Sequence, residues 1–418
     1  MSETHYLDYA ATSPLLPAAH DAWEEAQRTL RLTPGNPASL HSGGRAARRM
    51  LEDAREKVAH YLGAQRAEVV FTSGATESCA LAVVGGARGV HKRDPKRSTV
   101  VASRVDHDAV TQQLPVLEER GFTSAFLPVS NTGVSIMNEE DIASDSKNVA
   151  LYTLPIVSSE IGTYQPVEEL VRILSALNDP TALSRPLVHT DAAQALLTYD
   201  VNFSSLGVDM LSLGGHKIGG PVGIGVLLVK RGVPLISDRP GGGHERGIRS
   251  GTPDVAGAAS LAAALAEGVS QRGAHCQHMA NLREHLLQGL PADVQVTVPQ
   301  EAASPAIVHL SLPTLHPEAV LMAMDMAGVW VSAGTACHAG VTRPSQIVMA
   351  LGRSQEQALG VLRVSMGPLS TKEDIDAFLR VLPQALAAGQ ALDRREQKKT
   401  VRAAAAVADS ASWGVQDI

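Results

Sequence analysis

Two short stretches of the sequence carry side chains that could do chemistry together. In "HTDAAQ" (189–194), Asp191 ends an apolar run. A carboxylate placed there is costly unless a cation or several donors meet it, and a protonated pyridine nitrogen would be such a cation. The ordinary alternative is that Asp191 caps the helix that follows.

The second stretch is "SLGGHKIGGP" (212–221), where Lys217 lies between glycines just after another apolar run. A lysine that loses its proton in a closed pocket forms Schiff bases with aldehydes. A lysine on an exposed surface loop would explain the same residue without any chemistry.

An anion site is indicated by "TSGATES" (72–78), where a strand ends, a glycine turns the chain and a helix begins. The free N–H groups of Ala75 and Thr76 would point outward at the positive helix end, which suits a phosphate. Many such turns bind no ligand.

His107, in "RVDHDAV" (104–110), could stack on a flat ring, or it could simply lie near a helix cap.

Taken together, these features indicate pyridoxal phosphate. That cofactor requires a phosphate cradle, a carboxylate that keeps the ring nitrogen protonated and a lysine that holds the aldehyde. The helix start at Ala75, Asp191 and Lys217 meet the three requirements.

The elements that must position these residues are short apolar runs that alternate with helical patterns. The runs span 68–73, 98–103, 149–157, 186–191, 208–213 and 223–230, and helices are predicted over 43–62, 75–84, 107–120 and 166–177. Such alternation predicts an α/β domain with a largely parallel sheet. Ligands bind at the carboxyl ends of the strands in these sheets, which is where the polar residues lie.

A long loop and a second α/β unit complete the predicted organisation. Residues 231–252 are rich in Gly, Pro and Arg, which is typical of a functional loop. Strand and helix patterns resume after about residue 270, with strands predicted over 305–312, 329–334 and 361–366. We expect a large domain over 15–265, a small domain made of 1–14 and 266–400, and a flexible tail over 401–418.

The motifs identify a family resemblance over nearly the whole chain. They are "YLDYAATSPLLP" (6–17), "GNPASLH" (35–41), "VFTSGATES" (70–78), "EIG" (160–162), "HTDAAQ", "GGHKIGGP", "GGGHERGIRSGT" (241–252), "SAGTACHAG" (332–340) and "RVSMG" (363–367). The chain resembles the group I (NifS/IscS-type) cysteine desulfurases, in the class V aminotransferase branch of the fold type I pyridoxal phosphate enzymes. The resemblance implies a large domain with a mostly parallel seven-stranded sheet and a smaller C-terminal α/β domain.

The resemblance also implies roles for individual residues. The implied cofactor contacts are Lys217 with the aldehyde, Asp191 with the pyridine nitrogen, Gln194 with the ring hydroxyl, His107 on the ring face, and Ala75, Thr76 and His216 with the phosphate. Thr252 would reach the phosphate in a neighbouring subunit, which implies a homodimer. Arg363, helped by Asn36, would bind the carboxylate of the substrate L-cysteine.

Cys337 would be the nucleophile of such an enzyme. It lies among small residues in "SAGTACHAG", far along the chain from Cys79 and Cys276. A thiolate there would attack the substrate sulfur and carry it as a persulfide to an acceptor protein, while the substrate leaves as alanine. A free loop thiol is the plain alternative. Cys79 lies in an apolar helical stretch and is predicted to be a core residue.

Two predicted site positions depart from the family pattern. Where the family usually has Asn-Asn-Glu, this chain has Ser158-Ser159-Glu160, and the asparagine expected at Ser159 normally contacts cofactor and substrate. Gly214 replaces a serine whose hydroxyl would bind the phosphate. The C-terminal tail also differs from the part that typically meets an iron–sulfur scaffold protein.

Composition excludes several other classes of protein. The 418 residues are 44% hydrophobic and 19% charged, with a net charge of -7, which is ordinary for a globular protein. No basic patch predicts nucleic-acid binding, and no apolar run predicts a membrane span. The absence of a secretory signal and the three scattered cysteines indicate a reducing cytoplasm. No metal site is predicted; "HCQH" (275–278) is interpreted as a surface face.

Other functions remain compatible with the motifs. A selenocysteine lyase would use the same site chemistry, and another class V aminotransferase would not need Cys337. A weakly active pyridoxal phosphate-binding partner protein would fit the changes at Ser159 and Gly214. The sequence does not choose among iron–sulfur assembly, transfer-RNA thiolation and thio-cofactor synthesis as the destination of the sulfur.

Overall fold

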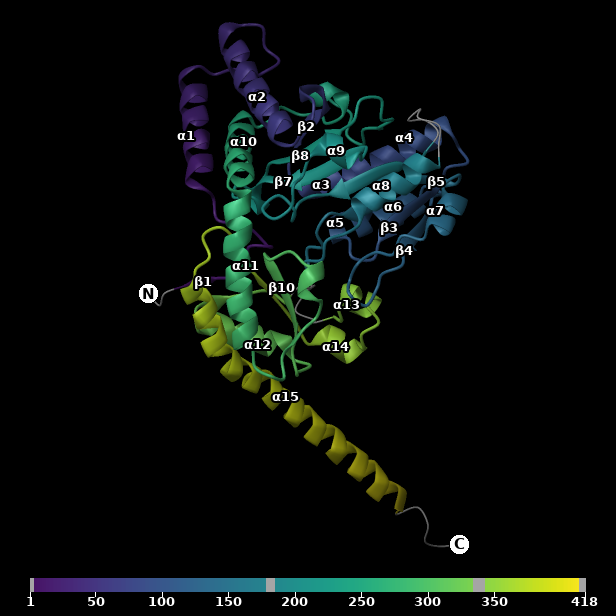
Figure 1. Cartoon of the computed structure of the whole chain (residues 1–418), viewed down its shortest axis with the longest axis vertical. Helices are drawn as coiled ribbons and strands as arrows, with labels where there is room; N and C mark the ends of the chain where they lie inside the picture. The colour runs from purple at the N-terminus through teal and green to yellow at the C-terminus, as the bar shows by residue number, and fades with distance from the viewer. Residues whose placement is uncertain (1–3, 178–184, 334–342, 413–418) are drawn as a thin grey trace.

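The computed structural model describes residues 4–177, 185–333 and 343–412, with side chains up to residue 398. Its larger part contains a seven-stranded sheet in the order β2-β8-β7-β6-β5-β3-β4 (Figure 1). The strands are β2 (Val69–Thr72), β3 (Thr99–Ser103), β4 (Thr123–Leu127), β5 (Val149–Pro155), β6 (Leu187–Asp191), β7 (Met210–Gly214) and β8 (Gly225–Val229). β8 alone runs opposite to the other six strands. The predicted α/β fold with a mostly parallel seven-stranded sheet is confirmed.

Alternate side chains of the strands belong to two hydrophobic cores, one on each face of the sheet. Val226 and Leu228 of β8 belong to the first core, whereas Leu227 and Val229 belong to the second. The first core includes residues of α1 (Pro17–Leu32), α2 (Ser42–Tyr61), α7 (Glu139–Asp145), α8 (Val167–Ala176), α9 (Phe203–Leu206) and α10 (Val255–Ser270). The second includes residues of α3 (Ala75–Ala80), α4 (Gly86–Arg93), α5 (Asp108–Thr111) and α6 (Gln113–Glu118). Burial on both faces explains why the central strands read as continuous apolar runs.

The smaller part contains two further sheets. One is antiparallel, with β10 (Ile307–Ser311) between β9 (Gln295–Val296) and β12 (Val361–Ser365), and the other pairs β1 (His5–Tyr6) with β11 (Val329–Trp330). Its helices are α11 (Arg272–Gly289), α12 (Pro317–Met326), α13 (Gln346–Ala350), α14 (Gln355–Leu359) and α15 (Lys372–Ser412). Leu7 shares a core with Leu310 and Phe378, so the N-terminal residues belong with this part. We propose Gln271, between α10 and α11, as the passage between the domains, a few residues beyond the predicted limit.

Three elements differ from the sequence-based expectation. Strand β4 was not predicted, because it is a partly exposed edge strand without a regular apolar pattern. The helix predicted over 75–84 continues through a π-helical segment (Leu81–Gly85) into α4, although Gly85 and Gly86 suggest an end. An added Cβ at Gly85 would lie 2.7 Å from the Ile236 carbonyl oxygen, so the glycine permits close packing of the segment after β8. The backbone of α15 stays helical to Ser412, past residue 400 where we expected the tail to begin, and projects from the body (Figure 1).

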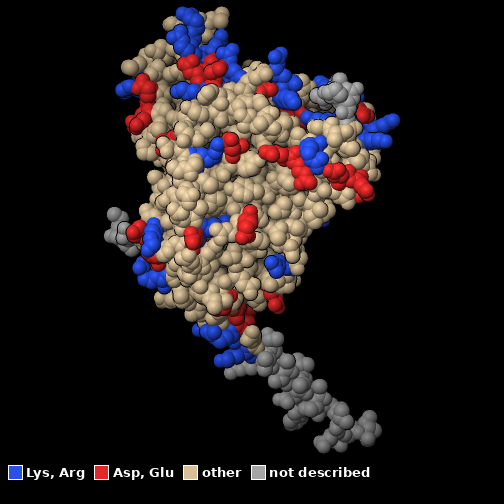
Figure 2. Space-filling model, in the orientation of Figure 1, with Lys and Arg blue, Asp and Glu red and all other residues tan. Residues whose placement is uncertain are grey.

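Charged side chains of both signs are spread over the surface. Figure 2 shows Lys and Arg gathered at the end formed by α1 and α2, with acidic groups directly beside them. Arg28 of this end, for example, pairs with Glu25. No helix in the described part of the chain is long and apolar enough to cross a membrane.

Candidate active site

Five segments that carry predicted site residues meet at the carboxyl edge of the large sheet. Because β8 is antiparallel to both β2 and β7, the ends of β2, β3, β5, β6 and β7 lie at one edge. The helix start at Ala75 follows β2, His107 follows β3 and Ser159 follows β5. Asp191 ends β6, and Lys217 lies in a 3-10 turn after β7. This is the edge at which α/β proteins bind their ligands.

The amine of Lys217 is held by the N-terminal segment of the chain. Its Nζ donates to the carbonyl oxygens of Ala10 (2.5 Å) and Ala11 (2.8 Å). Ser13 Oγ donates to the Lys217 carbonyl (2.9 Å), which anchors the turn from the same segment. Burial, with a smaller contribution from the positive charge of Arg363, lowers the pKa of Lys217 to about 8. A substantial fraction of the amine is therefore neutral near physiological pH and able to act as a nucleophile.

Asp191 lies buried at the centre of this edge. Its Oδ1 accepts a hydrogen bond from Ala193 N (2.8 Å). Burial raises the pKa of Asp191, and the hydrogen bond from Ala193 N and the nearby amine of Lys217 partly oppose that rise. A cationic ring nitrogen placed against this carboxylate would remove the cost of its burial. Cys79 is fully buried, as predicted, and neighbours Asp191; burial raises the pKa of its thiol well above the usual value.

The sequence allowed His107 to lie near a helix cap or to stack on a ring, and its position is compatible with both. It is the N-cap of α5, and its Nδ1 accepts from Ala109 N (3.0 Å). The ring is exposed and close enough to Asp191 to affect its pKa. The capping bond therefore orients the ring beside the site rather than removing it from the site.

The predicted anion cradle lies at the start of α3, and Gly214 faces it. A Cβ added at Gly214 would lie 3.4 Å from Ala75 N, 3.3 Å from Ala75 Cβ and 3.6 Å from His216 Cδ2. Position 214 therefore points toward the helix start, where a serine side chain would meet an anion. His216 Nδ1 is within hydrogen-bond distance of Thr12 Oγ1 (3.1 Å), and burial lowers the pKa of this histidine, which favours its neutral form.

Arg363 is fixed by groups from both parts of the molecule. Its guanidinium donates to the Ser159 carbonyl oxygen (2.9 Å) and to Asp8 Oδ1 (3.0 Å). Ser159 thus contributes its main chain to the site. Asp8 and Glu160, which lies next to Ser159, were not singled out from the sequence. The signal in the sequence that could have identified Asp8 is a charged residue inside the otherwise apolar motif "YLDYAA".

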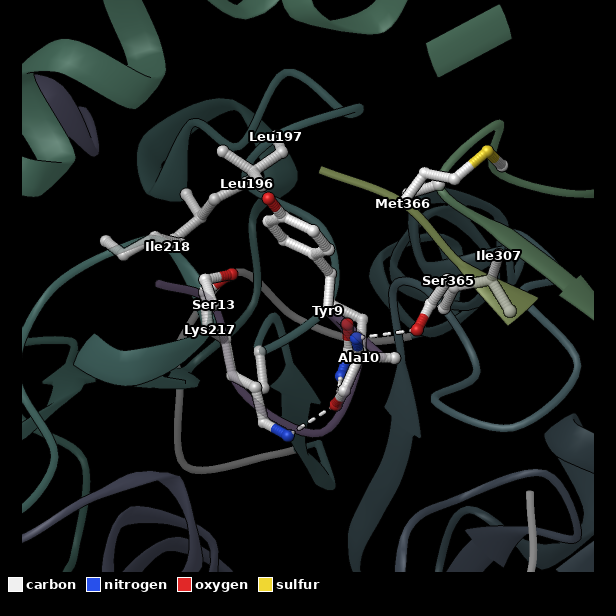
Figure 3. Close-up of a pocket in the computed structure, with 13 residues that line it drawn as sticks. Tyr9, Ala10, Ser13, Leu196, Leu197, Lys217, Ile218, Ile307, Ser365 and Met366 are labelled. Atoms are coloured by element: carbon white, nitrogen blue, oxygen red, sulfur yellow. Dashed lines mark hydrogen bonds between the residues drawn. The ribbon is translucent and has the colours of Figure 1, made fainter. Parts of the chain in front are cut away.

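Gln194 shares the Ala10 carbonyl with Lys217. Its Nε2 donates to that oxygen at 2.8 Å. Figure 3 shows Lys217 reaching toward Ala10, with Tyr9, Leu196 and Ser365 around a small adjoining cavity. The cavity measures about 20 Å³, which is room for about one water molecule. It lies between the two parts of the molecule and is too small for a cofactor.

Thr252 and Asn36 lie together, but apart from Arg363. Asn36 Nδ2 donates to Thr252 Oγ1 at 3.5 Å, and both residues are exposed. The α1–α2 connection that contains Asn36 is at one end of the molecule, whereas the sheet of β10 and β12 is in the smaller part (Figure 1). Within one chain the structure does not bring Asn36 to Arg363.

The loop over 231–252 is anchored by buried charge. Glu245, whose carboxylate is 1% exposed, forms a two-pronged pair with Arg55 (2.7 and 2.8 Å) and accepts from Phe71 N (2.9 Å). Glu77 of α3 pairs with Arg239 (3.0 Å) and Arg249 (3.2 Å) of the same loop. Glu245 and Arg246 have positive φ angles, which residues with side chains rarely adopt unless surrounding contacts hold them.

Two further sequence predictions concern cysteine chemistry and metal binding. Cys337 lies outside the described residues. In the "HCQH" stretch on α11, His278 Nε2 donates a hydrogen bond to the Ser370 carbonyl oxygen (2.7 Å). Among the residues that the structure describes, no three His, Cys, Asp or Glu side chains are grouped to hold a metal ion.

The donor set at this edge fits pyridoxal phosphate. The main-chain N–H groups at the start of α3 suit a phosphate, and the space beside Gly214 leaves them accessible. The buried Asp191 carboxylate suits a protonated ring nitrogen, and the partly neutral Lys217 amine suits an aldehyde. The residues of the site therefore match the cofactor group by group.

Comparisons with known proteins agree with this geometry. The family model described as aminotransferase class-V matches residues 5–378. An IscS-like cysteine desulfurase of Mycobacterium tuberculosis is 37% identical over 388 residues, which cover 91% of this chain and 96% of that protein. The cysteine desulfurase IscS of Dictyoglomus turgidum is 33% identical over 386 residues, covering 91% and 94%.

Solved structures show the same likeness. A NifS-like protein superposes with a TM-score of 0.82 at 30% identity, covering 92% of this chain and 100% of that one. DndA of Streptomyces lividans superposes with a TM-score of 0.69 at 32% identity, covering 86% and 99%.

Replacing Gly214 with Ser should strengthen binding of pyridoxal phosphate to the apoprotein roughly tenfold, because a hydroxyl is added beside the N–H groups at Ala75. Titration of the apoprotein by absorbance would measure this. Gly214→Ala adds the Cβ without the hydroxyl and should give no gain. An equal gain in both variants would show that packing, not the hydroxyl, is responsible.

Replacing Glu245 with Gln should lower the free energy of unfolding by about 3 kcal/mol, because it leaves the charge of Arg55 buried without its partner. Chemical denaturation would measure the change. Glu139→Gln removes the exposed Glu139–Arg172 pair (2.6 Å) and should leave the transition unaltered. A similar result for both variants would contradict an anchoring role for Glu245.

Proposed function

Because the chain belongs to the class-V aminotransferase family, and within it to the IscS- and NifS-like cysteine desulfurases, we propose that it converts L-cysteine to L-alanine and retains the sulfur as a persulfide on Cys337. The enzyme is a sulfurtransferase that uses pyridoxal phosphate. The residues described above would hold that cofactor in the roles for which their chemistry fits.

The observation that carries the proposal is the proximity of Arg363 to Lys217, since Asp8 and Ala10 of one N-terminal segment contact Arg363 and Lys217 respectively. The guanidinium of Arg363 is close enough to lower the pKa of the Lys217 amine. An amino acid whose carboxylate is bound by Arg363 would therefore have its α-carbon near Lys217. Asp8 and the Ser159 carbonyl hold the guanidinium in place, which fixes the end of the substrate that does not react.

Each residue then has a task in the reaction. When bound, the cofactor supplies an electron sink that weakens bonds at the α- and β-carbons of the substrate. Arg363 binds the carboxylate, and Lys217 in its neutral form moves the proton at the α-carbon. The Cys337 thiolate attacks the substrate sulfur, and a sulfur–sulfur bond forms as the carbon–sulfur bond breaks. The electron pair stays on the β-carbon, which takes a proton to become the methyl group of alanine.

A homodimer and an acceptor protein complete the proposal. Thr252 would contact the cofactor phosphate of the second subunit, and Asn36 lies beside Thr252. Leu40 and Val222 are 84% and 80% exposed, and a second copy of the chain would cover such apolar side chains. The persulfide would pass to a sulfur-acceptor protein, and the reducing cytoplasm would keep Cys337 a thiol between turnovers.

The direct test is release of alanine and sulfide from L-cysteine with a thiol reductant. We expect both products from the purified protein and neither from Cys337→Ala, because the substrate sulfur then has no acceptor. Cys79→Ala is the matched control, since Cys79 is buried and should not be required. Alanine and sulfide release that survives in Cys337→Ala would show that Cys337 is not the working nucleophile on L-cysteine.

Uptake of pyridoxal phosphate by the apoprotein should depend on pH through Lys217. Its pKa is lowered to about 8, so the neutral, reactive amine increases about tenfold per pH unit below that value and levels off above it. Stopped-flow absorbance from pH 6 to 9.5 would follow the rate, with Lys217→Ala as the control that takes up none. A rate that keeps rising up to pH 9.5 without levelling off would show an ordinary lysine.

A further inference from the structure

A buried polar cluster lies behind Arg363 and has no role in the mechanism above. Glu160 accepts a hydrogen bond from Ser345 Oγ, and its Oε1 lies 3.6 Å from His309 Nε2. His309 and Arg363 face each other across strands β10 and β12. All four residues are buried. A carboxyl group in such a place requires an explanation, because burial of an acid is unfavourable unless its partners compensate.

The groups around Glu160 determine how much of its carboxyl group is ionised at neutral pH. Burial raises the pKa of Glu160 to about 7; the Ser345 hydroxyl and the charge of Arg363 on β12 oppose the rise, and Asp108 on α5 adds to it. His309 on β10 is neutral, because burial lowers its pKa to about 3. The 3.6 Å approach of His309 to Glu160 is therefore neither an ion pair nor a hydrogen bond, and Ser345 on α13 is the group that binds the carboxylate directly.

The described residues on either side of the Cys337 segment are both attached to this cluster. Before the segment, Ser332 pairs with Arg363 through two main-chain hydrogen bonds (2.7 and 3.2 Å). After it, Ser345 caps α13 by accepting from Val348 N (3.0 Å) while it donates to Glu160. One flank is thus tied to the substrate arginine itself, and the other is tied to the carboxylate behind it.

We propose that Glu160 is a positioning residue that acts through Ser345, holding the C-terminal flank of the Cys337 segment in register with Arg363. The inference rests on the proposed desulfurase function. Arg363 sets where the substrate carboxylate binds. Ser332 and Ser345 fix the two ends of the segment that carries the Cys337 thiol. The Glu160–Ser345 hydrogen bond keeps the C-terminal flank of the Cys337 segment at a fixed distance from Arg363. The thiol is thereby positioned to meet the substrate sulfur.

The decisive comparison is between two helix caps. Ser345→Ala removes the cap of α13 together with the bond to Glu160. Ser354→Ala removes the equivalent cap of α14, where Ser354 accepts from Gln357 N (3.2 Å) and no contact with Glu160 is involved. Ser345→Thr keeps the hydroxyl and should restore the function. Glu160→Gln keeps an oxygen acceptor but loses the charge that strengthens the bond.

We expect Ser345→Ala to slow alanine formation roughly tenfold, with KM for L-cysteine within about threefold of the parent and unchanged affinity for L-alanine, which carries the carboxylate but no sulfur. Ser354→Ala and Ser345→Thr should resemble the parent. In Glu160→Gln the rate of alanine formation should no longer show the change near pH 7 that the titration of Glu160 causes in the parent. Combining Ser345→Ala with Glu160→Gln should cost no more than Ser345→Ala alone, because both changes affect one bond.

A readout that does not depend on turnover is the rate at which Cys337 is alkylated in the cofactor-free protein, followed by mass spectrometry. Ser345→Ala should change this rate at least threefold and Ser354→Ala should not. If the parent makes no alanine, the proposed function fails, and alkylation still decides the positioning role. If the parent is active but Ser345→Ala matches Ser354→Ala, or if KM and L-alanine affinity move together with the rate, the inference is overturned.

Discussion

The site depends on a single constraint, which is that the amine of Lys217 is half-buried and, among the residues that the structure describes, has no carboxylate in ion-pair contact. The main-chain carbonyls of Ala10 and Ala11 meet this need. An ammonium ion bound by carbonyls alone gives up its proton more readily than one paired with a carboxylate. The position of the N-terminal segment is therefore as important to the chemistry as the lysine itself.

That segment also joins the two parts of the molecule. Leu7 lies in the core of the smaller part, and Ala10 N donates to Ser365 Oγ on β12, two residues from Arg363. On the other side, Ser13 N donates to the His216 carbonyl, and Leu16 N donates to the Gly219 carbonyl on the turn that carries Lys217. Lys217 and Arg363, the residues proposed to act at the α-carbon and on the carboxylate of a substrate, are thus both positioned from one short stretch of chain.

The departures from the family pattern take a physical meaning from the structure. Ser159 contributes its carbonyl oxygen to Arg363, a contact that any residue type can make, so the loss of an asparagine side chain leaves that support intact. Gly214 removes a side chain that would face the start of α3, so its effect falls on anion binding. In the proposed reaction both changes concern ligand affinity, whereas Lys217 and Arg363 are the residues assigned to the reacting end and the carboxylate of the substrate.

The sequence alone predicted six of the seven strands of the large sheet and most of the residues at its carboxyl edge, and it indicated a cofactor class, because these depend on local patterns. Buried strands are apolar, helix starts follow glycine turns, and Asp191 and Lys217 stand out as charges after apolar runs. The edge strand β4 was invisible to that reasoning because it has no apolar face to signal it.

Tertiary structure alone decided which distant residues meet. The sequence separates Asp8 from Arg363, Arg55 from Glu245 and Glu160 from Ser345, and no local pattern predicts those pairs. Within one chain the tertiary structure also places Asn36 beside Thr252, a neighbour that no local pattern indicates. Burial favours the three pairings that contain a charged group, because a charge removed from water is costly unless it finds a partner.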